Sequence, residues 1–160
     1  MFFLLMLMPV MVWAQDDVIN EVCGVKFGSS YESVIDLDGA IGELDIEQSD
    51  KNRLLFWDVM YRDVFYSYAF FSFKYKGGNS YLDEVAFHKG CDSIEEARVF
   101  RWWIATTFGL QTDFDDDTIK GGRSPRDPKA KGFFIYIKRG IIERLPYEVV
   151  LRYGPYGYDQ

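Results

Sequence analysis

The sequence has little of several residue types, and each shortage narrows what the protein can do. It contains one histidine and two cysteines in 160 residues, and 18 lysines and arginines against 25 aspartates and glutamates. Two isolated cysteines and His88 do not supply a cluster of metal ligands, so we expect no metal and no cofactor. The net charge of −7 disfavours nucleic acid as a partner, because binding to phosphates depends on basic side chains.

Familiar catalytic motifs are also missing. A histidine-dependent nucleophile would depend on His88 alone, and no serine stands in a G-x-S-x-G context. The glycine pairs at 77–78 and 121–122 lack the lysine and hydroxyl residue of a phosphate-binding loop. Four carboxylates near predicted strands keep a small carboxylate-dependent hydrolase open as an alternative: Asp58, Asp63, Asp83 and Glu84.

No apolar run reaches the roughly 20 residues that a membrane-spanning helix needs. The run at residues 2–13 ends at Ala14 before three polar residues, which is typical of a signal-peptide core followed by a small-residue cleavage site. An amino-terminal core strand is the alternative, because no basic residue precedes the run. We expect residues 1–14 to be a signal peptide and residues 15–160 to form a single domain that is periplasmic or secreted.

Export changes what the two cysteines predict, because disulfides persist outside the reducing cytosol. Cys23 and Cys91 each lie shortly before a predicted helix start, so the two positions can be neighbours in the fold. We predict a Cys23–Cys91 disulfide. Two buried free thiols are the alternative, since cysteine is often simply a small core residue.

Apolar residues at 48% and aromatic residues at 18% are enough for one sizeable core. The S-x-x-E spacing of Ser29 and Glu32 is that of a capping box and predicts a first helix from Ser30 to about Asp38. The segment at 43–51 is acidic and irregular, and we interpret it as a loop or a short capping turn.

A second helix is predicted at residues 93–108, where Ser93 and Glu96 repeat the capping spacing and Gly109 can end the helix in a left-handed conformation. Its apolar residues recur at helical intervals, with Phe100, Ile104 and Phe108 among those expected to face the core.

Alternating apolar residues predict strands at 54–61, 64–75, 81–89, 132–139 and 147–153. The first three are expected to pair consecutively. Residues 111–131 have no periodicity and are interpreted as a long loop, in which Asp113, Asp115 and Asp117 imitate the start of a calcium loop without its later ligands. The predicted fold is α+β, with two helices packed on an antiparallel sheet of about five or six strands.

Aromatic residues outside the predicted core are the candidate binding residues. Trp102 and Trp103 lie off the apolar stripe of the second helix, so they are either shoulders of a wide buried face or an exposed pair available to a partner. Tyr156 and Tyr158 could stack on a sugar, although tyrosines near a carboxyl terminus also seal the edge of a core.

Several features together resemble small exported proteins of unknown function from Bacteroides-type bacteria. They are the stretch Gly24-Val-Lys-Phe-Gly-Ser-Ser-Tyr31, the aromatic strands, the Ser-Ile-Glu-Glu-Ala helix start at 93–97 and Tyr-Gly-Pro-Tyr at 153–156. More distantly, the G-x-x-x-G-x-S-x-x-x-V opening of a capped helix before antiparallel strands is similar to BamE-type lipoproteins and beta-lactamase inhibitor protein-like domains. The lipidated cysteine of the first is missing, and the repeat order of the second is not cleanly present.

These observations favour a non-catalytic binding or interaction domain in the periplasm or outside the cell, with an unknown protein as the favoured partner. Carbohydrate binding through exposed aromatic residues and a small carboxylate-dependent hydrolase are the alternatives.

Overall fold

A computed structural model of the chain describes residues 17–110, 118–140 and 144–158. The expected signal peptide at 1–14 and the calcium-like aspartates between 113 and 117 lie outside the described residues.

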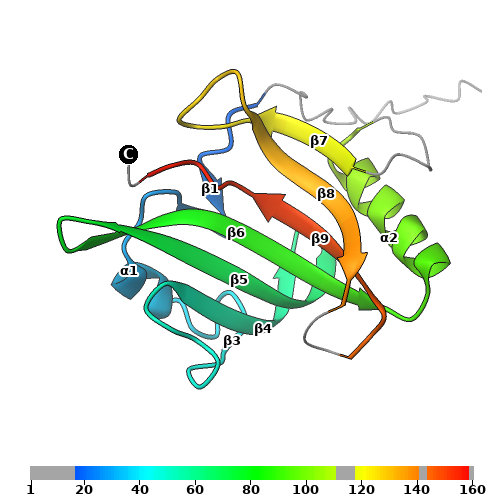
Figure 1. The fold of residues 1–160 in the computed structure, drawn as a ribbon, viewed down its shortest axis with the longest axis horizontal. Coiled ribbons are helices and arrows are strands. Elements are labelled where there is room, and N and C mark those ends of the chain that lie inside the picture. Colours follow the sequence, from blue (N-terminus) through cyan, green and yellow to red (C-terminus); the bar gives the residue numbers. More distant parts are fainter. Residues whose placement is uncertain (1–16, 111–117, 141–143, 159–160) are drawn as a thin grey trace, which may run out of the picture.

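Strands dominate the described chain (Figure 1). The strands are β1 (Glu21–Val22), β2 (Val25–Lys26), β3 (Glu43–Leu44), β4 (Arg53–Tyr61), β5 (Val64–Lys76), β6 (Asn79–Cys91), β7 (Thr118–Arg123), β8 (Lys131–Arg139) and β9 (Tyr147–Tyr153). The helices are α1 (Tyr31–Ile35) and α2 (Ile94–Thr107).

Seven strands form one antiparallel sheet in the order β3-β4-β5-β6-β9-β8-β7, and β1 and β2 form a separate hairpin. The predicted α+β fold of two helices on five or six strands is therefore wrong, because among the described residues the sheet has seven strands and only α2 is longer than five residues. The five strands predicted from alternation are all present, and β4, β5 and β6 pair consecutively as expected.

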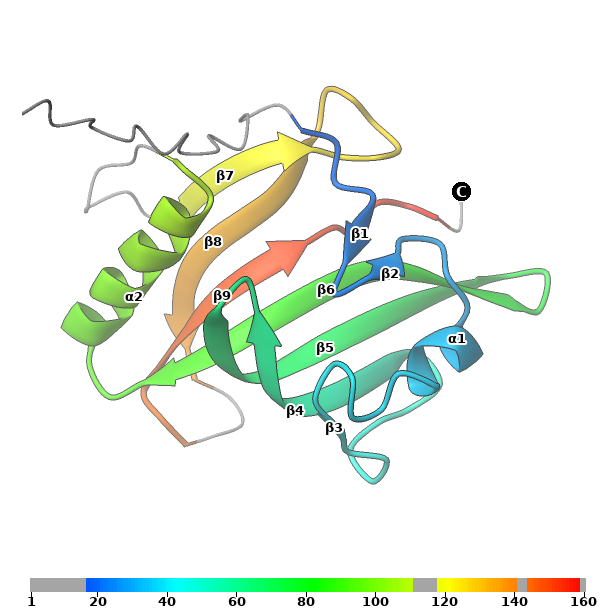
Figure 2. The ribbon, with the colours of Figure 1, turned by 180° about the vertical axis from the view of Figure 1, so that it is seen from behind.

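The sheet has a core face and an outer face. The β1–β2 hairpin, α1 and α2 contribute to one hydrophobic cluster with alternate residues of the long strands, which defines the core face. Figure 2 shows the hairpin and α1 on the side of the sheet that is turned away from the viewer in Figure 1. The outer face, formed by the other alternate residues, has neither helix against it.

Helix α2 begins and ends as the sequence predicts. The Ser93 hydroxyl accepts a hydrogen bond from the Glu96 amide at 3.1 Å. At the other end, the Gly109 amide donates to Thr106 and the Leu110 amide to Ala105, with Gly109 at φ +67°, which is a Schellman motif. A glycine is favoured here because it adopts positive φ without a steric penalty.

Helix α1 is shorter than predicted and starts one residue later. Ser30, not Ser29, is the N-cap, and its hydroxyl accepts from the Ser33 amide at 3.3 Å. Of the five helical residues only Val34 is buried, so little packing energy supports a further turn. The chain leaves the helix at Asp36, about two residues before the predicted end near Asp38.

Two strands occur where loops were predicted. Strand β7 lies within the supposed loop at 111–131 and pairs along β8, while β3 lies at the start of the segment 43–51 and pairs with β4. Gly121 of β7 packs directly under the ring of Phe133, where any side chain would collide with it. Pairing with a neighbouring strand therefore orders a segment that has no alternation of its own.

Candidate functional site

The outer face of the sheet brings together polar and aromatic residues from distant parts of the sequence. The register aligns Arg53 of β4 with Ser72 of β5, and Ser72 with Glu84 of β6. A second row runs from Trp57 through Tyr68 and His88 to Val150. The first row lines a groove that contains charged side chains. The second row passes through a cluster of buried polar side chains.

The buried polar cluster is centred on Glu148 of β9, which has no exposed surface. One carboxylate oxygen accepts from the Tyr68 hydroxyl at 2.6 Å. The other lies 3.2 Å from both Nδ1 of His88 and Nζ of Lys138. The cost of burying the carboxylate is offset by these three partners.

The aromatic surroundings hold His88 in place. Its ring stacks on Tyr68 at a centroid distance of 4.5 Å and meets the edge of Phe70 at 5.5 Å. Burial lowers the pKa of His88 below its ordinary value, although Glu148 opposes that shift. A neutral His88 can donate from Nδ1 to Glu148.

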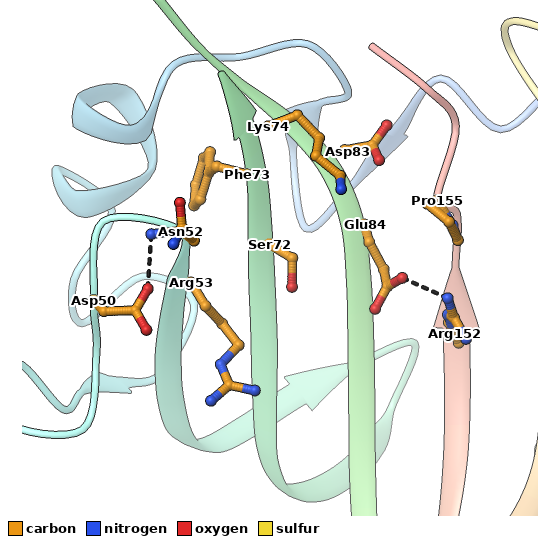
Figure 3. Close-up of a pocket in the computed structure, with 10 residues that line it drawn as sticks. All are labelled: Asp50, Asn52, Arg53, Ser72, Phe73, Lys74, Asp83, Glu84, Arg152 and Pro155. Atoms are coloured by element: carbon orange, nitrogen blue, oxygen red, sulfur yellow. Dashed lines mark hydrogen bonds and ion pairs between the residues drawn. The ribbon is translucent and has the colours of Figure 1, made fainter. Parts of the chain in front are cut away.

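The second feature of the outer face is a groove of about 500 Å³. We call it the outer-face groove, and Figure 3 shows the ten residues that line it: Asp50, Asn52, Arg53, Ser72, Phe73, Lys74, Asp83, Glu84, Arg152 and Pro155. Neither His88 nor Glu148 lines it. The buried cluster therefore lies beside the groove and does not open into it.

The carboxylates of the groove are already engaged. Asp50 accepts from the Asn52 amide at 2.7 Å, and Glu84 forms an ion pair with Arg152 at 2.7 Å. Asp83 is 1% exposed and accepts from the backbone amides of Tyr156 and Tyr158. It fixes the terminal segment and is not a free catalytic carboxylate.

Two of the three cations of the groove have no carboxylate partner among the described residues. The Arg53 guanidinium stacks on the ring of Phe70 at 4.2 Å. Within the described ranges neither Arg53 nor Lys74 takes part in an ion pair. The groove thus presents two cationic groups, together with the Ser72 hydroxyl, to solvent (Figure 3).

A third feature is an apolar patch on helix α2, which we call the α2 patch: Val99, Trp102 and Trp103. Val99 is 55% exposed, and each tryptophan is 43% exposed. The opposite side of the helix buries Ala97, Ile104, Ala105 and also Arg101. Trp103 also lines a cavity of about 360 Å³ with Arg62, Asp63 and Thr107.

The four aromatic residues predicted to bind a partner differ in how far they are exposed. Trp102 and Trp103 are partly exposed on α2, consistent with the interpretation of an available pair. Tyr156 is buried, with its ring edge-on to Phe27 and its hydroxyl donating to the Gly132 carbonyl. Tyr158 is half-buried, beneath the Arg126 guanidinium. Tyr156 closes an edge of the core and is not a surface for a sugar.

The predicted disulfide is not formed, since both cysteines are free thiols. Cys23 occupies the turn of the β1–β2 hairpin, whereas Cys91 is the last residue of β6. Burial raises the pKa of Cys23 to about 12 and that of Cys91 to about 11. Both are thiols of low reactivity at neutral pH, as in the alternative of two free cysteines.

The described residues contain no group of three or more His, Cys, Asp and Glu side chains placed to hold a metal ion. Over the same ranges, no helix has the length and apolar character needed to cross a membrane. In comparisons with known proteins, the chain matches no family model, no curated protein and no solved structure.

Sequence reasoning missed the Glu148 cluster and the outer-face groove. Glu148 and Tyr68 are 80 residues apart, and only the order of β5, β6 and β9 brings them together. The one usable signal was a charged residue next to the apolar run Val149–Leu151 of a predicted strand. Such a residue needs a buried partner, but the sequence does not say which.

Proposed function

We propose that the protein is an exported, non-catalytic binding domain whose partner is another protein, and that the α2 patch contacts this partner. Export is supported by the apolar run at 2–13 that ends at Ala14. The binding part of the proposal rests on one observation, the exposure of two neighbouring tryptophans on a helix whose other side is packed against the sheet.

Tryptophan is enriched at the centres of protein interfaces, where its large ring loses water. Trp102 and Trp103 lie three and four residues after Val99, so all three residues lie on neighbouring positions of one helix face. Charged groups border this face at Glu95 and Arg98, as is typical of the rim of an interface.

The cavity beside Trp103 offers a place for a side chain of the partner. Arg62, which lines it, is held over the ring of Phe108 at 4.2 Å. A fixed arginine next to an exposed tryptophan combines two of the three residue types that most often dominate binding energy.

The positions of the carboxylates support binding over hydrolysis. Asp83 holds the terminal backbone, and Glu84 is paired with Arg152. Asp58 and Asp63 both have positive φ, at the bend of β4 and in the turn before β5.

Photo-crosslinking in the native host tests this proposal. A benzophenone amino acid at position 99 should yield one crosslinked protein, and the yield should fall when Trp102 and Trp103 are both changed to serine. The matched control carries the probe at Ile46, which is 74% exposed in the connection between β3 and β4. Figure 2 shows β3 well apart from α2. Equal yields at positions 46 and 99, or no effect of the double substitution, would contradict the proposal.

A further inference from the structure

The outer-face groove is lined by three carboxylates and three cations, and within the described residues two of these cations, Arg53 and Lys74, are in no ion pair. Arg53 projects from the first strand of the row Arg53–Ser72–Glu84, and the ring of Phe70 supports one face of its guanidinium. Stacking leaves the N–H groups at the edge of the guanidinium free to bind a carboxylate by two hydrogen bonds. Lys74 adds a second positive charge to the same groove (Figure 3).

A ligand that covers Glu84 in the groove must also donate hydrogen bonds. Glu84 uses Oε2 for the Arg152 guanidinium, and its side chain remains 23% exposed. Its second oxygen is an acceptor that a covering ligand must satisfy, because an unpaired buried acceptor is costly. A simple carboxylate cannot do this, whereas a molecule with hydroxyl groups can.

An apolar pocket of about 310 Å³ continues the groove beyond Arg152. It shares Arg152 and Pro155 with the groove, and its other lining residues are Thr118, Phe134, Tyr136 and Gly154. Phe134 and Tyr136 are partly exposed, and aromatic rings are a type of surface against which the C–H face of a sugar ring packs. Three strand spacings of about 4.8 Å separate Arg53 on β4 from Arg152 on β9, so an occupant of both ends is extended.

We propose that the outer-face groove binds a short acidic oligosaccharide, with one carboxylate at Arg53, a second carboxylate at Lys74 and hydroxyl groups at the Glu84–Arg152 pair. This site lies on the face opposite to the one that α2 covers and does not depend on the α2 patch. The two sites can therefore be tested separately.

Calorimetric titration of the mature protein with trigalacturonate tests the proposal. Trigalacturonate should bind, and its fully methyl-esterified form, which keeps the rings and loses the charge, should bind at least about tenfold more weakly. Arg53→Gln should weaken trigalacturonate binding to a similar extent. Lys26→Gln, which removes an exposed cation from the β1–β2 hairpin, is the matched control and should leave the affinity unchanged.

Failure of trigalacturonate to bind at about 10 mM would overturn the proposal, because such an affinity is negligible. So would equally tight binding of the esterified form, or an unchanged affinity in Arg53→Gln. Binding of triglutamate or inorganic phosphate as tight as that of trigalacturonate would also overturn it. Arg53 is exposed, so Arg53→Gln should keep the fold, and an unchanged melting temperature verifies this.

Discussion

The hydroxyl group of Tyr68 lies 2.6 Å from a carboxylate oxygen of Glu148, and both residues are completely buried. The contact joins β5 to β9, the last strand among the described residues. Since β6 lies between them, the hydrogen bond crosses a whole strand of the outer face. The buried polar cluster thus ties the two halves of the sheet together.

Replacing Glu148 with leucine should lower the free energy of unfolding by about 3–5 kcal/mol, because Lys138 would lose its carboxylate and Tyr68 and His88 their acceptor. Urea denaturation measures this. Glu84→Leu is the matched control, since its ion pair with Arg152 is partly exposed and should contribute about 1 kcal/mol or less. Similar losses in the free energy of unfolding would mean that the buried cluster contributes no more than a partly exposed ion pair.

Stability should fall as the pH is lowered through the titration of His88. The unfolded histidine binds a proton near pH 6.5, whereas burial lowers the pKa in the folded state. The unfolded state therefore binds more protons in this window, and the contribution present above about pH 6.5 is lost as the pH falls toward the lower folded pKa.

Urea denaturation between about pH 8 and pH 5.5 measures this effect, because His88 is the single histidine of the sequence. His88→Gln keeps a hydrogen-bond donor for Glu148 and removes the titration. Its free energy of unfolding should depend less on pH than that of the wild type. The same slope in both proteins would exclude His88 as the cause.

Substitutions in helix α2 should lower the stability of the protein mainly on the side that faces the core. Ile104 is fully buried, so Ile104→Ala should cost about 2–5 kcal/mol. Val99→Ala, on the exposed side, should change stability by about 0.5 kcal/mol or less. Phe100 is half-buried against Tyr66, so the cost of Phe100→Ala should lie between these values. A larger loss from Val99→Ala than from Ile104→Ala would place the helix the wrong way round.

Both thiols should be slow to react in the folded protein, since burial raises the pKa of Cys23 to about 12 and of Cys91 to about 11. Iodoacetamide near pH 8 should modify neither quickly. In urea without reductant, mass spectrometry should show two alkyl groups, and reductant should not change the melting temperature. A denatured protein that takes up no alkyl group would contain the disulfide after all.

The sequence predicts the elements that carry their own local signal. Alternation reveals the five long strands, and the Ser93 cap with Gly109 delimits α2. Strand β7 lacks such a signal, because Gly121 and Gly122 interrupt it and its order comes from pairing with β8. The length of helix α1 is overestimated for the opposite reason, since its capping pattern is a good local signal but too few buried residues follow it.

The candidate sites depend more on the fold than the elements do. Trp102 and Trp103 could be singled out from the helical period alone. The outer-face groove could not, because Arg152 comes from β9, and the sequence predicts the consecutive pairing of β4, β5 and β6 but not the place of β9 beside β6. For Tyr156 the sequence leaves sugar stacking and sealing of the core edge both open, because its burial depends on the distant Phe27 and Gly132.

The most direct test of the proposed function compares folding and binding in the double variant Trp102→Ser, Trp103→Ser. Both side chains are 43% exposed, so the variant should stay folded, while crosslinking from position 99 to the partner should be lost. Met60→Ser, a change at another exposed apolar residue, should leave the crosslink intact. A folded double variant that still crosslinks at the wild-type yield would contradict the proposal that the α2 patch is the binding surface.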